Sequence, residues 1–116
     1  MLTDRTFVHT KIFDRQWSAL GCDDDDLLEL QKAISEDPQK PPVIRGTGGV
    51  RKIRIALENR GRSGGARVLY VDFVIRDTVG LLYAYPKSEK EDIDENERQL
   101  LKKMVKQISE NWRNNK

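Results

Sequence analysis

The chain of 116 residues (13.4 kDa) is predicted to form one domain over residues 1–116, because a chain of this length can bury a stable core. Hydrophobic residues make up 37% and charged residues 34%, and the apolar residues are clustered, which excludes a disordered chain. No apolar run approaches the roughly 20 residues that span a bilayer, and no signal peptide is evident, so we expect a cytoplasmic protein without a membrane partner. A single cysteine and a single histidine exclude a disulfide framework and a Cys/His zinc site, and we expect neither a metal nor a cofactor.

The net charge of +2 is unevenly distributed along the chain. Residues 14–37 carry eight acidic and two basic side chains, whereas residues 43–71 carry seven basic side chains and one acidic side chain. This segregation is typical of a domain that presents a positive face to a polyanion, for which phosphate groups are the obvious candidate. The alternative interpretation is that the basic side chains solubilise one face of a sheet.

Two helices are predicted after a short strand at Thr6–His9. Apolar residues recur at helical spacing over residues 12–20, and Gly21 follows where a helix end favours a left-handed residue. The next helix begins after the run Asp23–Asp26 and ends before Pro38. We interpret the aspartates as helix caps rather than calcium ligands, because an EF-hand loop needs spaced ligands and a central glycine. The two helices form a predicted helical hairpin.

Three strands and a long helix are predicted to follow. Apolar and basic residues alternate over residues 52–57, which indicates a half-buried strand with a basic outer face. The other expected elements are a glycine-rich loop at Glu58–Gly65, a strand at Ala66–Val74, a turn at Arg76–Thr78, a strand at Val79–Tyr85 and a helix over Ile93–Trp112. The short connections favour an antiparallel meander, and the whole order of elements predicts an α+β fold with helices packed against an antiparallel sheet.

The basic strand and its neighbours hold the strongest candidate site. Period-two geometry places Lys52 and Arg54 on the same face of a strand, roughly 7 Å apart, which is comparable to the spacing of phosphates along a nucleic acid strand. Arg67 opens the next strand, and Lys87 follows the third, so both could reach the same surface. The sequence therefore predicts a cluster of cations that binds a phosphodiester.

Other polar and aromatic residues are weaker candidates. We interpret His9 as a packed or edge histidine and Cys22 as inert, because no basic neighbour in the sequence activates its thiol. The glycines of residues 46–49 resemble a phosphate loop, but a strand follows them instead of a helix, which excludes a nucleotide P-loop. Tyr83 and Tyr85 either stack on unpaired bases or belong to the core.

Three segments occur in a characteristic order: IRGTGGVRKIRIA, RGRSGGARVLYV and LLYAYPKSEKEDI, followed by an acidic and then apolar helix. In this combination the chain resembles the RelE/ParE superfamily of toxins, and in particular the HigB-like RelE toxins of bacterial type II toxin–antitoxin systems. The resemblance extends from about Thr6 to Trp112. Each short motif is degenerate, but their order and spacing together are specific.

The resemblance implies a microbial-RNase-like fold, cleavage of mRNA in the A site of the 30S ribosomal subunit, and neutralisation by a cognate antitoxin of the helix-turn-helix, HigA-like type. It gives catalytic roles to Lys52, Arg54, Arg67 and Lys87. Further RNA contacts are expected from Arg45, Arg51, Arg60, Arg62, Tyr85 and Lys90. The chain departs from RelE itself in having Ser88 where an arginine is expected and no tyrosine from Ile93 onwards.

Metal-free RNA cleavage needs an acceptor for the 2′-OH proton, cations on the phosphorane and a proton for the leaving oxygen. Because the basic region lacks an acidic cluster, we expect lysines and arginines to carry most of this chemistry. Crowded cations lower the pKa of a lysine, so Lys52 or Lys87 could act as the base, or the ribosome and mRNA could supply part of the site. Two other functions stay open: a ParE-like poison of DNA gyrase and a non-catalytic RNA-binding module.

Overall fold

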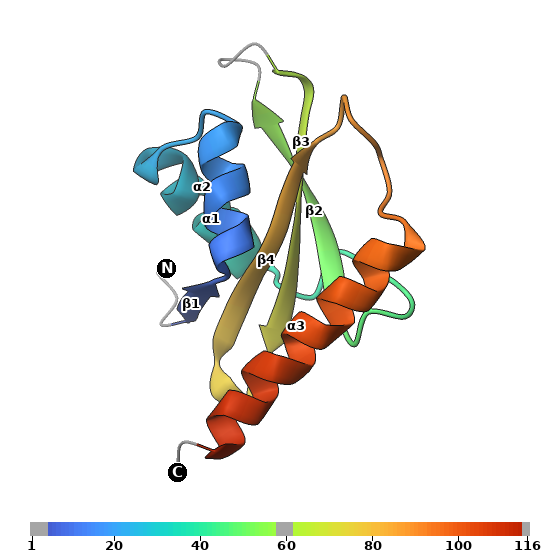
Figure 1. Ribbon diagram of the computed structural model, residues 1–116. Coiled ribbons are helices and arrows are strands. Elements are labelled where there is room, and N and C mark those ends of the chain that lie inside the picture. Colours follow the sequence, from blue (N-terminus) through green and yellow to red (C-terminus); the bar gives the residue numbers. More distant parts are fainter. Residues whose placement is uncertain (1–4, 58–61, 115–116) are drawn as a thin grey trace.

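Three α-helices and a four-stranded sheet make up the fold in the computed structural model, which describes residues 5–57 and 62–114 (Figure 1). In chain order the elements are β1 (Thr6–His9), α1 (Lys11–Ala19), α2 (Asp24–Glu36), β2 (Val50–Leu57), β3 (Arg62–Phe73), a 3-10 helix (Val74–Arg76), β4 (Thr78–Pro86) and α3 (Glu95–Asn114). This order confirms the α+β prediction, including the helical hairpin and the final helix.

The sheet has the strand order β1-β4-β3-β2. The pairs β2–β3 and β3–β4 are antiparallel, so the predicted meander is confirmed. β1 pairs with β4 in parallel, with Thr6 opposite Thr78 and His9 opposite Leu81, which makes the complete sheet mixed. The difference arises because β1 reaches the meander from a distant part of the chain, without a hairpin turn to impose the antiparallel direction.

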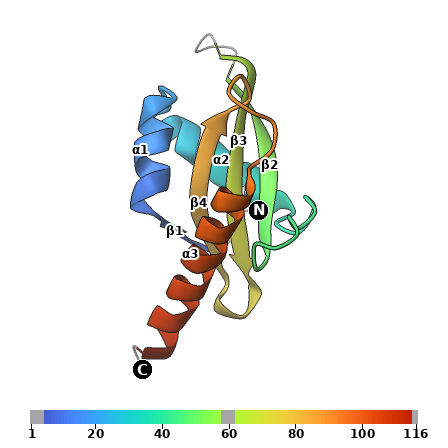
Figure 2. The same ribbon diagram turned by 45° about the vertical axis from the view of Figure 1, so that its right-hand side comes forward.

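Helices cover both faces of the sheet (Figure 2). The hairpin of α1 and α2 packs on one face, where Phe13 and Ile34 are buried against Val68 and Tyr70 of β3. On the opposite face, Leu101 of α3 belongs to a second buried cluster with Leu69, Val71, Leu82 and others. Burial on both faces explains why residues 66–71 of β3 are continuously apolar apart from Arg67.

Side-chain caps begin both helices of the hairpin. The hydroxyl of Thr10 accepts a hydrogen bond from the backbone N–H of Phe13 and donates one to the carbonyl oxygen of Leu82 on β4. Asp23 and Asp26 form a reciprocal capping box at the start of α2. The capping interpretation of the aspartates is confirmed.

β3 begins at Arg62, earlier than predicted, so the expected loop Glu58–Gly65 is partly strand. Residues 58–61 of that loop lie outside the described part of the chain. An irregularity in the β2–β3 pairing lies between Ile55 and Leu57, opposite this glycine-rich start of β3. Gly65 has a φ of +70°, and a Cβ there would lie 1.9 Å from the carbonyl oxygen of Ile55, so only glycine fits. The close approach brings β2 and the start of β3 together at the candidate site.

Candidate functional site

The sheet register brings three of the predicted cations onto one face. Arg54 lies opposite Arg67, and Lys52 lies opposite Leu69. Leu69 belongs to the cluster buried beneath α3, and residues paired across neighbouring strands point to the same side of a sheet. Lys52, Arg54 and Arg67 therefore share the α3 face, as the sequence predicted for them.

Glu91 binds Arg67 through both of its carboxylate oxygens. The Nε atom of Arg67 donates to Oε2 of Glu91 at 2.6 Å, and the Nη2 atom donates to Oε1 at 2.8 Å. A further nitrogen of the guanidinium, Nη1, donates to the carbonyl oxygen of Ala66 at 3.2 Å. The side chain of Arg67 is 5% exposed, whereas that of Glu91 is 41% exposed. The carboxylate thus lies on the outside of a buried guanidinium.

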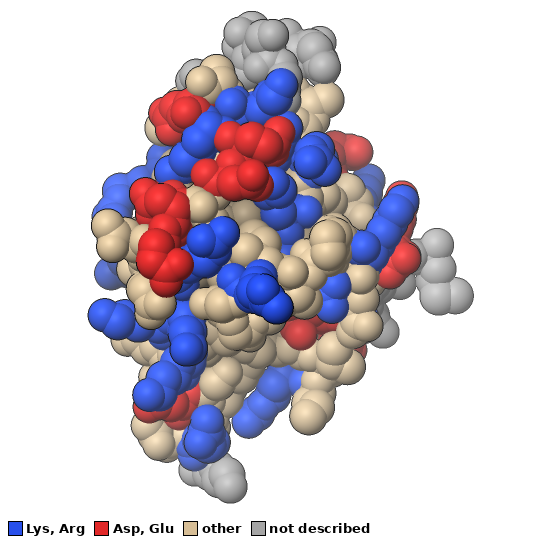
Figure 3. All heavy atoms as spheres, turned by 90° about the vertical axis from the view of Figure 1, so that its right-hand side faces the viewer, with Lys and Arg blue, Asp and Glu red and all other residues tan. Residues whose placement is uncertain are grey.

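Lys52 contacts the same short segment, which joins β4 to α3. Its ammonium lies 2.8 Å from Oδ1 of Asp92, 3.4 Å from Oε2 of Glu91 and 3.2 Å from the carbonyl oxygen of Glu91. That carbonyl also accepts a hydrogen bond from the hydroxyl of Tyr85 at 3.0 Å. Figure 3 shows acidic side chains among more numerous basic ones on the side of the molecule that carries β2 and α3. Lys52 and Arg67 are therefore each paired with carboxylates of this segment.

These contacts change the ionisation of their partners. Hydrogen bonds from Arg67, and then from Lys52, lower the pKa of Glu91 from 4.5 to about 2 against a smaller opposing effect of desolvation. Burial, followed by the nearby carboxylates of Asp92 and Glu91, raises the pKa of Tyr85 to about 12. At neutral pH Glu91 is therefore a carboxylate with little affinity for a proton, and Tyr85 is a neutral phenol.

A groove of about 820 Å³ runs beside the cluster, along the outer edge of β2. Lys52, Ile53 and Arg54 form one wall, and residues between Ala33 and Pro42 form the other. β2 is the last strand in the sheet order, so this groove lies outside the sheet. The groove is lined by three cations, Lys40, Lys52 and Arg54, and by the carboxylates of Glu36 and Asp37, and its size leaves room for an extended polyanion.

Comparison with known proteins identifies the family. Residues 5–115 match the family model described as RelE toxin of RelE / RelB toxin-antitoxin system. The chain belongs to the RelE toxin family. The identification as a RelE-type toxin of a toxin–antitoxin system is therefore confirmed.

Solved structures of RelE have a similar fold. An arginine-to-alanine double mutant of E. coli toxin RelE in the free state is 16% identical, with a TM-score of 0.53 over 76% of this chain and 88% of that chain. The intact E. coli RelBE toxin-antitoxin complex contains a chain that is 17% identical, with a TM-score of 0.49 over 76% of this chain and 99% of that chain. At this identity the first match supports the RelE fold alone.

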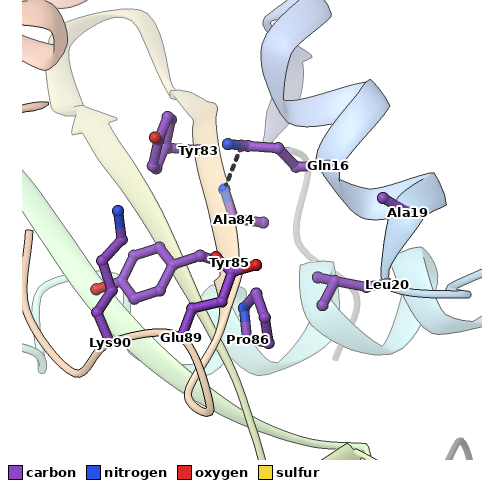
Figure 4. A pocket seen from close by; sticks show the side chains of 9 residues that line it. All are labelled: Gln16, Ala19, Leu20, Tyr83, Ala84, Tyr85, Pro86, Glu89 and Lys90. Carbon is purple, nitrogen blue, oxygen red and sulfur yellow. Dashed lines mark hydrogen bonds between the residues drawn. The ribbon is translucent and has the colours of Figure 1, made fainter.

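Tyr85 lies in the core, so the predicted base-stacking surface is wrong for this residue. It is 3% exposed, and it belongs to the cluster under α3. Lys90 lies 5.3 Å from the centre of the Tyr85 ring and forms an ion pair with Glu97, which also accepts a hydrogen bond from Tyr83 at 2.7 Å. Figure 4 shows Lys90 beside the Tyr85 ring in a pocket that α1 closes through Gln16. In the free RelE-family chain, both expected RNA contacts face the protein itself.

Among the other predicted RNA contacts, Arg51 lies away from the cluster. Arg51 lies opposite Tyr70, on the face of the sheet covered by α1 and α2, and its guanidinium donates to the carbonyl oxygens of Gln39 and Pro41. This places Arg51 outside the cluster because successive strand residues point to opposite faces. Arg45 is exposed and precedes β2. Arg60 and the side chain of Arg62 lie outside the described part of the chain.

Lys87 is exposed just after β4, and its backbone N–H donates to the carbonyl oxygen of Gly65 at 3.0 Å. The backbone of Lys87 is therefore held near the start of the segment that carries Arg67. Its ammonium makes no ion pair within residues 5–57 and 62–114. The convergence of the Lys87 ammonium on the surface of Lys52 and Arg54 stays a prediction.

The carboxylates of the site, Glu91 and Asp92, were not predicted from the sequence. The basic segment carries no acidic cluster of its own, but Glu91 comes to Arg67 from 24 residues away and Asp92 comes to Lys52 from 40 residues away. The charged contacts of Lys52 in the described residues are carboxylates, and its role as the base stays a prediction. One signal was available: Glu91 follows a strand that returns antiparallel to β3, whose start carries Arg67.

Two absences hold for the described residues. No group of three or more His, Cys, Asp or Glu side chains within them could hold a metal ion. No helix within them is long and apolar enough to cross a membrane.

Proposed function

We propose that this RelE-family toxin is a ribosome-dependent mRNA endoribonuclease that inhibits translation. The observation that carries the proposal is the convergence of Lys52, Arg54 and Arg67 on one sheet face beside the groove along β2. A site for phosphodiester cleavage needs such a convergence, because negative charge accumulates on the phosphorane oxygens in the transition state. A poison of DNA gyrase that acts through protein contacts does not need it.

The reaction would follow the usual course of metal-independent RNA cleavage. The 2′-OH loses its proton, its oxygen forms a bond to phosphorus, and the bond from phosphorus to the 5′-oxygen breaks as that oxygen takes up a proton. The products are a 2′,3′-cyclic phosphate and a 5′-hydroxyl. Arg54, Arg67 and Lys52 would stabilise the phosphorane, and Lys87 at the rim would contact the RNA backbone.

The charge balance of the site supports dependence on the ribosome. Lys52 and Arg67 are already paired with carboxylates in the free protein, so a free RNA strand meets only Arg54 and Lys87 as unpaired cations among the described residues of the site. A ribosome that holds mRNA in one geometry reduces the entropy lost on forming the cleavage complex. The ribosome and mRNA would also supply groups for proton transfer.

The proposed partners are mRNA, the ribosomal A site and a cognate antitoxin, and the proposed location is the cytoplasm. One of the similar structures is a complex of RelE with the antitoxin RelB. The three motifs resemble HigB-like toxins, so we expect a helix-turn-helix antitoxin of the HigA type. An acidic antitoxin segment would bind the basic segment of residues 43–71 rapidly through charge attraction.

In vitro translation with the purified protein, followed by primer extension on the mRNA, tests the proposal. We expect cuts within translated mRNA and little cleavage of the same RNA without ribosomes. Efficient cleavage of naked RNA would contradict the ribosome dependence. Intact mRNA together with accumulation of gyrase-linked DNA breaks would instead favour the ParE-like function, and binding of RNA without any cuts would favour a non-catalytic module.

A further inference from the structure

Arg67 and Lys52 together form an anion-binding site, which a carboxylate of the same chain fills. Oε2 of Glu91 accepts from Nε of Arg67 at 2.6 Å and lies 3.4 Å from Nζ of Lys52, while Oε1 accepts from Nη2 of Arg67 at 2.8 Å. A guanidinium offers this same pair of parallel donors to a phosphate. The carboxylate therefore occupies a position that is built to bind two oxygens of one anion.

We propose that Glu91 takes the place of an RNA phosphate in the free protein, and that RNA binds by displacing the Glu91 side chain from Arg67. The inference rests on the proposed function for the identity of the anion as an RNA phosphodiester. Glu91 then acts as an internal competitor that weakens the binding of RNA. In the complex with RNA its side chain no longer contacts Arg67.

The surroundings of Glu91 allow its side chain to move while its backbone stays in place. The carbonyl oxygen of Glu91 is held by the hydroxyl of Tyr85 at 3.0 Å and by Lys52 at 3.2 Å. Ile93, two residues later, is buried in the cluster beneath α3. The carboxylate itself is partly exposed, so rotation about its side-chain bonds can take it away from the guanidinium and into solvent.

Exposed cations lie where they can attract the incoming strand. Arg54, opposite Arg67, and Lys87 are exposed, and neither forms an ion pair within the described ranges. Phosphates bound there would bring the next phosphate of the strand close to Arg67. At that stage a phosphodiester and the Glu91 carboxylate compete for the same donors, and removing Glu91 from the competition should favour the RNA.

The test compares the wild-type protein with Glu91→Gln, and uses Glu89→Gln as a control for the loss of one negative charge from the same segment. Glu89 is exposed and makes no contact with Arg67 or Lys52. The probe is a short fluorescent RNA with 2′-O-methyl groups, which cannot be cleaved, and anisotropy reports its binding. We expect E91Q to bind the probe at least about tenfold more tightly than the wild-type protein and E89Q at most about twofold more tightly.

Thermal unfolding supplies a measurement that does not depend on RNA, and it also shows whether E91Q folds. Sodium phosphate, compared with sodium chloride at equal ionic strength, should raise the Tm of E91Q more than that of the wild-type protein, because a ligand stabilises the state that binds it. Glu91→Asp, which keeps the charge on a shorter side chain, provides a second variant if E91Q unfolds. The affinity of E91D for the RNA probe should lie between that of the wild-type protein and that expected for E91Q, because the shorter carboxylate reaches Arg67 less well.

Equal or weaker binding of the probe by E91Q, or equal gains for E91Q and E89Q, would overturn the inference. If E91Q were unfolded, binding by E91D no tighter than wild type would overturn it as well. Failure of the proposed function has a different signature. The wild-type protein would then leave mRNA uncut on ribosomes, whatever the binding measurements give.

Discussion

The two faces of the sheet are covered in different ways, although the same strands supply both. On the face of α1 and α2, Val68 and Tyr70 of β3 are buried by apolar side chains such as Phe13. On the other face α3 covers Leu69, but Arg67 is covered by the carboxylate of Glu91. Apolar cover gains its stability from exclusion of water, whereas an ion pair at the surface can exchange its partner for another anion. Both faces therefore bury an apolar core, and the second also carries an ion pair that can exchange its carboxylate for a ligand.

Truncation of the apolar face should have the largest effect on stability. Phe13→Ala removes a fully buried ring that stacks on Trp17 at 5.4 Å, so we expect the free energy of unfolding to fall by about 4 kcal/mol. Urea denaturation measures the change. Leu28→Ala, at a half-exposed position on the same hairpin, is the control and should change it by less than about 1 kcal/mol. An equally small loss of unfolding free energy in both variants would show that the apolar core under α1 and α2 contributes little to stability.

On the face covered by α3, Arg54→Ala should abolish activity without unfolding the protein. Loss of one cation from the phosphate site is expected to reduce mRNA cleavage by about 100-fold or more and to relieve growth arrest on expression. The unfolding free energy should change by no more than about 0.5 kcal/mol because Arg54 is exposed. Arg113→Ala, near the far end of α3, is a matched control that should stay toxic. Undiminished toxicity of Arg54→Ala at equal expression would remove Arg54 from the site.

Arg67→Ala should differ from Arg54→Ala in affecting both activity and stability. The buried guanidinium holds the Glu91 segment against β3, so its loss should cost about 2 kcal/mol of unfolding free energy in addition to the loss of cleavage. Arg67→Lys keeps the charge but cannot form the bidentate pair, so it should recover only part of this stability. The measurement is urea denaturation of the three proteins side by side. If Arg67→Ala were as stable as Arg54→Ala, the ion pair would have no structural role.

The smallest expected effect is the change in unfolding free energy with pH, which reports the ion pair between Glu91 and Arg67 directly. Because the folded protein holds the pKa of Glu91 near 2, below its ordinary 4.5, the carboxylate stabilises the fold above pH 4.5 and loses this contribution as the pH falls toward 2. The difference in unfolding free energy between wild type and Glu91→Gln should therefore be constant near neutral pH and shrink through that acidic range. Urea titrations at a series of pH values measure it. When Arg67→Ala is added to both proteins, the difference in unfolding free energy should depend much less on pH. An unchanged pH dependence would rule out Arg67 as its main cause.

Local features of the chain predicted the elements and part of the site. Asp23 caps α2 through contacts within three residues, and the alternation of residues 52–57 places Lys52 and Arg54 on one face, because these effects depend on neighbours in the sequence. The order of the three motifs was enough to indicate the RelE family. The sequence predicted that Arg67 on the next strand could reach the same surface, and the structure places it opposite Arg54.

Only the tertiary structure decided which segments meet. The parallel pairing of β1 with β4 joins residues 72 positions apart, such as Thr6 and Thr78, and no local pattern encodes that direction. The burial of Tyr85 was left open by the sequence, because alternation does not reveal whether a helix covers a strand face. No role for Glu91 was predicted from the sequence, because its environment is set by Arg67 and Lys52 on two other strands. The sequence by itself determined which cations belong to the candidate site. Only the tertiary structure decided that the carboxylate of Glu91 pairs with Arg67 and Lys52, because these partners lie on segments that folding brings together.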